Sequence, residues 1–218
     1  MDSSMTTLII QGTFETLYMT LVSTLIAYII GLPVGVLLVT SDSEGIVPMR
    51  LLNKVLDIIV NITRSIPFLI LLIAVIPFTR FVVGTSIGST ATIVPLVLAA
   101  APFIARLVES SIKEVDYGII EASLSMGASP LQVVTKVMIP EAKPSLIIGA
   151  AIATTTILGY SAMAGIVGGG GLGDIAIRFG YYRYETGVMV VTVMLLVLIV
   201  QIFQEFGMKI AQKQDHRK

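Results

Sequence analysis

The chain has 218 residues, of which 55% are hydrophobic and only 13% are charged, too few charges to cover a water-soluble domain of this length. Its 14 basic and 14 acidic residues balance, which argues against a nucleic-acid-binding protein, and the absence of cysteine excludes disulfides and thiolate metal sites. We therefore expect an all-α membrane protein.

The apolar residues gather in segments long enough to cross a membrane, since a helix needs about 20 residues to span roughly 30 Å of hydrocarbon. The residues before the first segment include Asp2 and Glu15 but no Lys or Arg, unlike the basic start of a secretory signal, so we expect that segment to stay in the membrane. Together the segments predict a single transmembrane domain over residues 1–218. Five transmembrane helices are expected, at about 16–39, 57–79, 90–109, 145–166 and 187–207.

The basic residues are unevenly divided between the two sides of these helices. Eleven of the 14 fall after the first, third and fifth helices, and three fall on the opposite side: Arg80, Arg178 and Arg183. The positive-inside rule then places the N-terminus outside and the C-terminus in the cytoplasm. The long segment at about 114–143, between the third and fourth helices, is therefore expected to be cytoplasmic.

Ionisable side chains are absent from the middle of the expected spans, where an ion-coupled transporter usually places them. Arg64 and Glu109 lie near cytoplasmic helix ends, and we expect their long side chains to reach lipid headgroups or a partner. A proton- or sodium-driven mechanism is therefore disfavoured.

The chain also lacks the G-x-x-x-x-G-K-[ST] loop that holds nucleotide phosphates. The glycine-rich run 168–173 has no Lys, falls on the outer side, and is interpreted as a flexible turn that allows close backbone approach. We expect no catalytic, cofactor-binding or metal-binding residues. Energy for any uphill movement of a solute would have to come from another subunit.

The segment at about 114–143 has the pattern of two short helices. The first begins after Asp116, a possible N-cap, and ends at Gly127, the residue type best able to adopt the left-handed conformation. The second begins at Ser129, with a proline in its first turn and a capping-box glutamine three residues later. We expect Pro140 and the proline four residues later to end the second helix, so that the pair lies along the membrane surface.

This segment also contains a specific pattern of small and apolar residues. Glu121-Ala122-Ser123 is followed after three residues by Gly127, and after nine more by Val137-Met138-Ile139-Pro140. The pattern resembles the E-A-A-x3-G-x9-I-x-L-P signature of the permease subunits of bacterial ABC importers, with small or apolar departures at positions 123, 137 and 139. In that family the signature forms the coupling helix, which sits in a groove of the nucleotide-binding subunit.

The resemblance implies that the segment docks on a separate ATPase, whose movement is passed to the membrane helices as a rigid-body push. Ala122 and Gly127 permit close approach, while the carboxylate of Glu121 meets a basic or backbone partner. An amphipathic hairpin resting on lipid headgroups is the alternative, which the scarcity of Lys and Arg disfavours. The expected docking residues are Glu121, Ala122, Ser123, Gly127, Ala128, Ser129, Pro130, Ile139 and Pro140.

Most of the chain, roughly residues 12–207, is similar to the permeases of bacterial methionine ABC importers. The matching stretches include Gly31-Leu-Pro-Val-Gly35, Asn61-Ile-Thr-Arg-Ser-Ile-Pro-Phe68 and Gly159-Tyr-Ser-Ala-Met163. This resemblance implies import of methionine, D-methionine included, across the bacterial inner membrane. The implied assembly is a homodimer of this chain with two subunits that bind ATP and an extracytoplasmic substrate-binding lipoprotein. An importer of another amino acid and a non-transport assembly protein are the alternatives, and a channel is disfavoured because no ring of pore-lining charges is visible.

The fourth expected helix is the best candidate to line a transport path, because it is rich in small and hydroxyl-bearing residues. We hypothesise that Met163, with Tyr160 and the neighbouring Ser161, closes this path as a flexible apolar gate; ordinary packing in the bundle is the equal alternative. Gly31 and Gly35 form a small-x-x-x-small pair that either joins two copies of the chain or packs within one.

Overall fold

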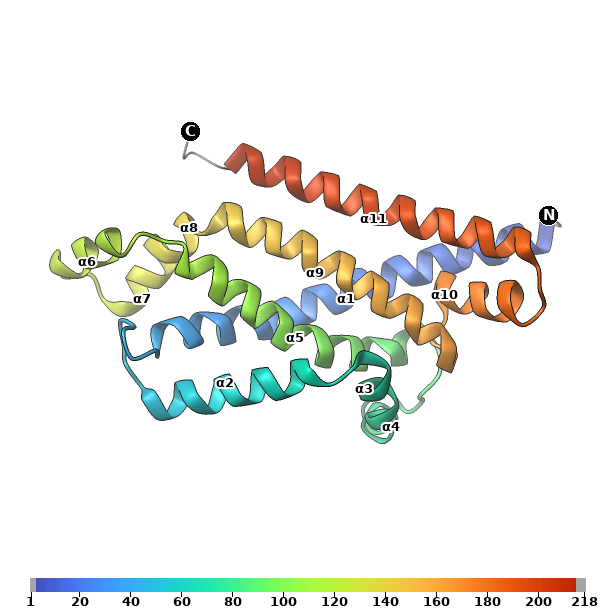
Figure 1. Cartoon of the computed structure of the whole chain (residues 1–218), viewed down its shortest axis with the longest axis horizontal. Helices are drawn as coiled ribbons and strands as arrows, with labels where there is room; N and C mark the ends of the chain where they lie inside the picture. The colour runs from blue at the N-terminus through green and yellow to red at the C-terminus, as the bar shows by residue number, and fades with distance from the viewer. Residues whose placement is uncertain (1–2, 215–218) are drawn as a thin grey trace.

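Helices account for all the regular secondary structure in residues 3–214, the part of the chain that the structure, a computed structural model, describes. Four helices are long and apolar enough to cross a membrane, and a fifth span is a bent pair whose two axes differ by 101°. The five expected spans are thus found when the bent pair is counted as one (Figure 1). The four long helices are α1 (Ser3–Thr40), α5 (Ser89–Lys113), α9 (Lys143–Ala164) and α11 (Thr186–Gln214).

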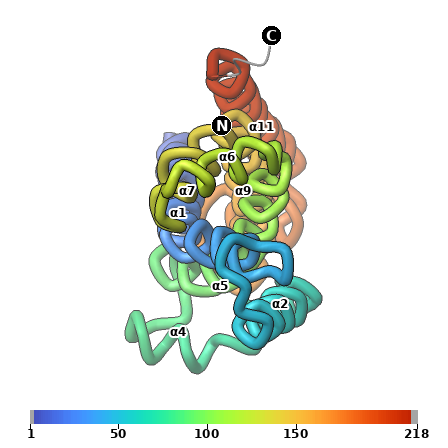
Figure 2. The backbone as a smooth tube through the Cα atoms, turned by 90° about the vertical axis from the view of Figure 1, so that its left-hand side faces the viewer, coloured from blue at the N-terminus to red at the C-terminus, as the bar shows by residue number. Residues whose placement is uncertain are grey.

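The expectation of a continuous helix over 57–79 is wrong, because the second span is broken. It consists of the bent pair α2 (Arg50–Ser65) and α3 (Phe68–Ala74), and α4 (Ile76–Val83) follows it. The break falls at Ile66, which is extended with φ −82° and ψ 122°, because the ring of Pro67 disfavours a helical conformation in the residue before it. α2 lies to one side of the bundle in the view along its length (Figure 2).

The first span begins well before the expected residue 16 and packs closely on α5. A Cβ atom added to Gly31 would lie 2.7 Å from the carbonyl oxygen of Ala101, and one on Gly35 would lie 2.5 Å from that of Ala105. Only glycine lets the two backbones approach this closely. The small-x-x-x-small pair therefore packs within one chain, and it gives no argument for a contact between two copies.

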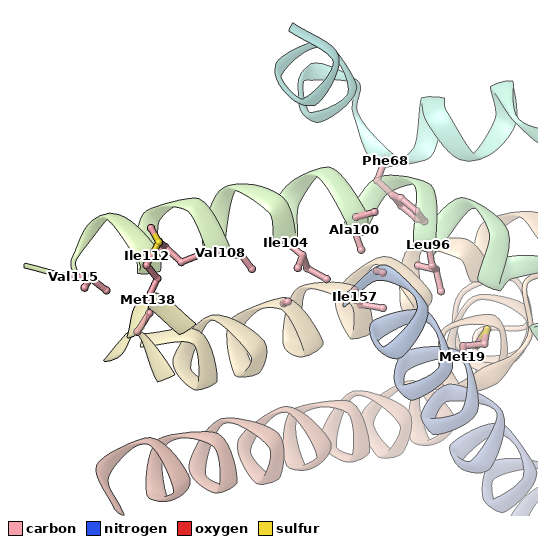
Figure 3. Close-up of a cluster of buried hydrophobic side chains, with 14 of the residues drawn as sticks. Met19, Phe68, Leu96, Ala100, Ile104, Val108, Ile112, Val115, Met138 and Ile157 are labelled. Atoms are coloured by element: carbon pink, nitrogen blue, oxygen red, sulfur yellow. The ribbon is translucent and has the colours of Figure 1, made fainter. Parts of the chain in front are cut away.

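α5 is the centre of the bundle. The most apolar part of α5 is 56% buried, against 28% or less for the other three long helices. Leu96, Ile104 and Val108 are each at most 1% exposed, and Figure 3 shows them along one face of α5. Phe68 of α3 reaches the same core. α5 therefore forms the centre of the main core, while a second buried cluster joins residues of α1, α9 and α11 without it.

One end of the bundle carries α6 (Tyr117–Ser125) and α7 (Pro130–Val133), beyond the ends of α5 and α9 (Figure 1). α7 continues through a π-helical turn (Val134–Met138) and α8 (Ile139–Glu141) to the start of α9. The expectation that Pro140 ends this helix is wrong. Pro140 lies in the first turn of α8, directly after the wider π-helical turn, and both features accommodate its missing N–H group.

The opposite end contains the glycine-rich run, within a 3-10 turn (Gly165–Val167), α10 (Gly171–Ile175) and a π-helical turn (Ala176–Tyr181). Gly171 has a φ of +74°, and a Cβ atom there would lie 2.6 Å from Oγ1 of Thr16. Its N–H group donates to the carboxylate of Glu15 over 2.8 Å. The close backbone approach expected for this run is present, but the run is packed against α1 rather than forming an open turn.

Candidate functional site

The turn between α6 and α7 is fixed by backbone hydrogen bonds. Asp116 caps α6, since its carboxylate accepts from the N–H of Gly118 over 2.7 Å. At the other end Gly127 has a φ of +83°, its N–H donates to the carbonyl of Leu124 over 2.9 Å, and the N–H of Ala128 donates to that of Ser123 over 3.1 Å. This pair of bonds is the Schellman arrangement, which satisfies the last carbonyls of a helix.

α7 begins with the capping box that the sequence predicts. The N–H of Gln132 donates to the hydroxyl of Ser129 over 3.4 Å, and the N–H of Ser129 donates to the side-chain carbonyl of Gln132 over 2.9 Å. Pro130 occupies the first helical position, where a missing N–H removes no hydrogen bond. The two helices are therefore held at a defined angle by four residues of connecting chain rather than by a loose loop.

One face of this helix pair anchors it to the bundle, and the other is open. Ile120, Val133 and Met138 are buried with the main core. On the opposite side Met126 is 82% exposed and Leu131 is 72% exposed. Such large apolar groups on a protruding tip are typical of a surface that another protein covers. We call this surface the docking face, and it consists of the exposed residues Glu121, Ala122, Met126, Gly127 and Leu131.

The other expected docking residues support this face rather than forming it. Ser123 is buried, and its hydroxyl donates to the carbonyl of Ile119 over 2.8 Å. Ala128 and Ile139 are half-buried, and Ser129, Pro130 and Pro140 are exposed beside the tip. The sequence pattern missed Met126 and Leu131 as surface residues, because an apolar stripe on a short helix is ordinarily interpreted as its packed side.

A group of ion pairs ties α5 to α2 near the docking end. The guanidinium of Arg106 pairs with Asp57, donates to the side-chain carbonyl of Asn61 over 2.8 Å, and pairs with Glu109 over 2.6 Å. Lys113 approaches Glu109 to 2.8 Å. The expectation that Glu109 reaches headgroups is wrong, because its side chain is only 11% exposed and lies between two cations.

The residues of the hypothesised gate do not all share one environment. The ring of Tyr160 stacks on that of Phe68, with centroids 4.5 Å apart and planes 7° apart. Met163 is 47% exposed, so its side chain lies on the surface of α9 and is free to contact a second chain or a solute. Ser161 is only 2% exposed and its hydroxyl donates to the carbonyl of Leu158 over 2.8 Å, so it faces the interior of the chain.

A bundle of membrane spans with an exposed helix pair at one end is typical of a class of protein, the membrane component that works with a partner. The comparison with protein families makes this specific. Residues 28–206 match the family described as binding-protein-dependent transport system inner membrane component. The chain belongs to this family.

Individual relatives are similar to the chain over most of its length. The probable D-methionine transport system permease protein MetI of Vibrio cholerae is 49% identical over 210 residues, 96% of this chain and 93% of the relative. The D-methionine transport system permease protein MetI of Escherichia coli K12 is 53% identical over 165 residues, 76% of each chain.

Solved structures give the same result for the fold. A chain from the inward-facing MetNI methionine ABC transporter has a TM-score of 0.98 and 49% identity, covering 99% of this chain and 100% of that one. A chain from an amino acid ABC transporter solved with histidines has a TM-score of 0.78 but only 21% identity, so it shows a common fold alone.

Proposed function

We propose that this chain is the permease subunit of an ABC importer for methionine, D-methionine included. The observation that carries the proposal is the match to a chain of the MetNI methionine transporter over 99% of the sequence with a TM-score of 0.98. The near full-length identity to a D-methionine permease supports the same substrate. The chain supplies the membrane route and no catalytic residue of its own.

The energy for transport comes from a separate ATPase subunit, which binds the ATP. The docking face supports this assignment, because Glu121 offers a carboxylate among small and apolar groups on a tip whose angle is fixed by caps at both helices. A rigid tip transmits a push from the partner to α5 and α9, whereas a loose loop would absorb it.

Two copies of the chain form the membrane part, each docked to one ATPase subunit, with a substrate-binding lipoprotein on the outer side. A transport path at a two-fold axis needs only one open helix face from each copy. The chain lies in the bacterial inner membrane with its N-terminus outside and its docking segment in the cytoplasm, as the distribution of Lys and Arg favours.

Uptake by vesicles that contain the complete complex tests the substrate. We expect labelled L-methionine to accumulate only with ATP, and unlabelled D-methionine to reduce its uptake when added in excess. Histidine and glutamine serve as competitors of different side-chain chemistry and are expected to leave uptake unchanged. If methionine itself fails to accumulate while another amino acid does, the substrate is wrong and the importer assignment stands.

Replacement of Met163 by Ala tests the gate. We expect the shorter side chain to raise ATP hydrolysis in the absence of substrate by about threefold or more, because a widened path no longer depends on substrate for opening. Met194→Ala on α11 is the control, since it removes an equally flexible side chain that is 65% exposed elsewhere. Unchanged basal hydrolysis and unchanged uptake in Met163→Ala would remove this residue from the gate.

A further inference from the structure

The helix α2 presents three faces of different chemistry. Leu56 and Val60 pack against Leu38 and Ala105, which makes the first face the one that holds α2 to the bundle. The second face is apolar and exposed, with Leu51 at 80%, Val55 at 45%, Ile58 at 45%, Ile59 at 55% and Ile62 at 61%. The third face is polar, and its members recur every three or four residues along one side of the helix: Arg50, Asn53, Lys54, Asp57, Asn61 and Arg64.

The polar face is only partly used by contacts within the chain. The amide of Asn53 donates to the carbonyl of Leu38 over 2.7 Å, and Asp57 pairs with Arg106. Lys54, Asn61 and Arg64 nevertheless stay exposed. Figure 2 shows α2 at the margin of the bundle, and within residues 3–214 these three side chains remain uncovered.

Lipid suits the apolar face of α2 but not the polar one. Charged and amide side chains within a membrane span face protein or a water-filled space, because hydrocarbon offers them neither hydrogen bonds nor counter-charges. The apolar face already provides α2 with a lipid-facing side. The polar face must therefore look toward water or toward a second protein.

Direct contact between the polar faces of two copies is disfavoured by their charges. In a two-fold symmetric pair with both copies in the same orientation, a residue near the axis meets its own equivalent at the same depth. Lys54 would then lie opposite Lys54 and Arg64 opposite Arg64, and like charges so placed repel each other. A water-filled gap between the copies avoids this repulsion.

The position of the polar face along the bundle indicates which end of the bundle the water-filled gap reaches. α2 starts at the end that carries α6 and α7, and it ends at the break before α3 (Figure 1). Phe68, the first residue of α3, is buried in the core of its own chain, where its ring stacks on Tyr160. A route along the polar face of α2 therefore extends from the break toward the end that carries α6 and α7.

We propose that the polar face of α2, through Lys54, Asn61 and Arg64, lines the aqueous route by which a zwitterionic amino acid leaves toward the cytoplasm. The amide of Asn61 and the guanidinium of Arg64 offer hydrogen bonds to the carboxylate of the solute as it passes. The assignment rests on the proposed function as a permease, and it identifies a wall of the route that is separate from the gate hypothesised on α9.

The absence of cysteine from the natural sequence allows a direct test by single cysteine substitutions in the complete complex. Asn61→Cys and Arg64→Cys probe the polar face. Lys54→Cys is added because Asn61 accepts a hydrogen bond from Arg106, whereas Lys54 is not bonded to it. Ile59→Cys and Ile62→Cys are matched controls from the same turns of the same helix. The complexes are placed in vesicles with the ATPase outward and treated with a charged, membrane-impermeant methanethiosulfonate.

We expect the polar-face cysteines to react at least tenfold faster than those at positions 59 and 62, and added L-methionine at high concentration to slow the reaction at positions 61 and 64. A lipid-soluble maleimide should label both sets, which shows that the control cysteines are present and reactive. Equal rates on the two faces would overturn the proposal. The proposal would also be overturned if all polar-face cysteines failed to react with the methanethiosulfonate and formed disulfides between copies. That result would mean that a second chain covers this face.

This test can fail independently of the proposed function. Uptake of methionine by the cysteine-free complex is measured in the same vesicles. Normal uptake with equal labelling of both faces overturns the α2 route and leaves the importer in place. The polar face could instead be labelled fast while methionine neither slows the labelling nor is taken up. That result would keep an aqueous route along α2 and overturn the assignment of its solute.

Discussion

Replacement of Gly127 by Val is expected to release the ATPase partner from the complex and to abolish ATP-driven uptake. Gly127 has a φ of +83°, a conformation that costs a β-branched residue about 1–3 kcal/mol. Either the turn is lost and α6 and α7 change their angle, or the turn persists and two new methyl groups stand on the docking face. A loss of about 2 kcal/mol in docking lowers the affinity for the partner by roughly 30-fold. The measurement is the amount of ATPase that co-purifies per permease in mild detergent.

The chain provides a matched control for this substitution at Gly84. This residue ends α4 with a φ of +84°, and, like Gly127, it has no atom within 4 Å of an added Cβ. Gly84→Val therefore introduces the same backbone strain far from the docking face, and it should leave co-purification unchanged. Gly127→Asn separates strain from bulk, since Asn tolerates the left-handed region. Equal retention of the ATPase by the valine variants at positions 127 and 84 would show that the tip is not the docking surface.

Replacement of Gly35 by Val is expected to destabilise the membrane bundle itself. A Cβ atom at this position would lie 2.5 Å from the carbonyl oxygen of Ala105 and 2.6 Å from Cβ of Val108. Both neighbours belong to α5, so α1 would have to move away from the central helix. Overpacking of this kind costs about 1–3 kcal/mol, and the rigid backbone on both sides places the cost at the upper end. A fall in the thermal denaturation midpoint of the purified complex is the measurement.

Gly159→Val on α9 is the matched control for the stability prediction. Gly159 is a helical glycine in a membrane span as well, but no atom lies within 4 Å of an added Cβ. We expect this variant to keep the midpoint of the natural protein within a few degrees. A similar fall in both variants would indicate a general intolerance of valine in these helices, and would refute the specific contact between α1 and α5.

The sequence predicted the structure of the segment around α6 and α7 well because that structure is local. The N-cap at Asp116, the left-handed Gly127 and the capping box at Ser129 each depend on residues no more than a few positions apart. The Schellman bonds follow from the same short stretch. Local patterns do not reveal which side of a helix will be covered, and for this reason Met126 and Leu131 were not foreseen as exposed.

The ion pairs of Arg106 were not foreseen because they join residues far apart in the chain. Asp57 and Arg106 are separate charges in two apolar segments, and the sequence contains no sign that the two meet. Their opposite charges were the only available signal. Glu109 is a different case, because Arg106 and Lys113 lie only three and four residues away on the same helix. Its side chain was expected to reach headgroups or a partner, although these two cations hold it in the protein.

The sequence by itself determined that this is an α-helical membrane protein with five spans and a helix pair of fixed geometry between the third and fourth. Hydrophobic length, helix caps and turn glycines are properties of single segments, so a linear pattern is sufficient to predict them. Only the tertiary structure decided that Gly31 and Gly35 pack against α5 and that α2 keeps a polar face exposed. These features depend on which helices lie side by side, and the docking tip around Gly127 acquires its open face for the same reason.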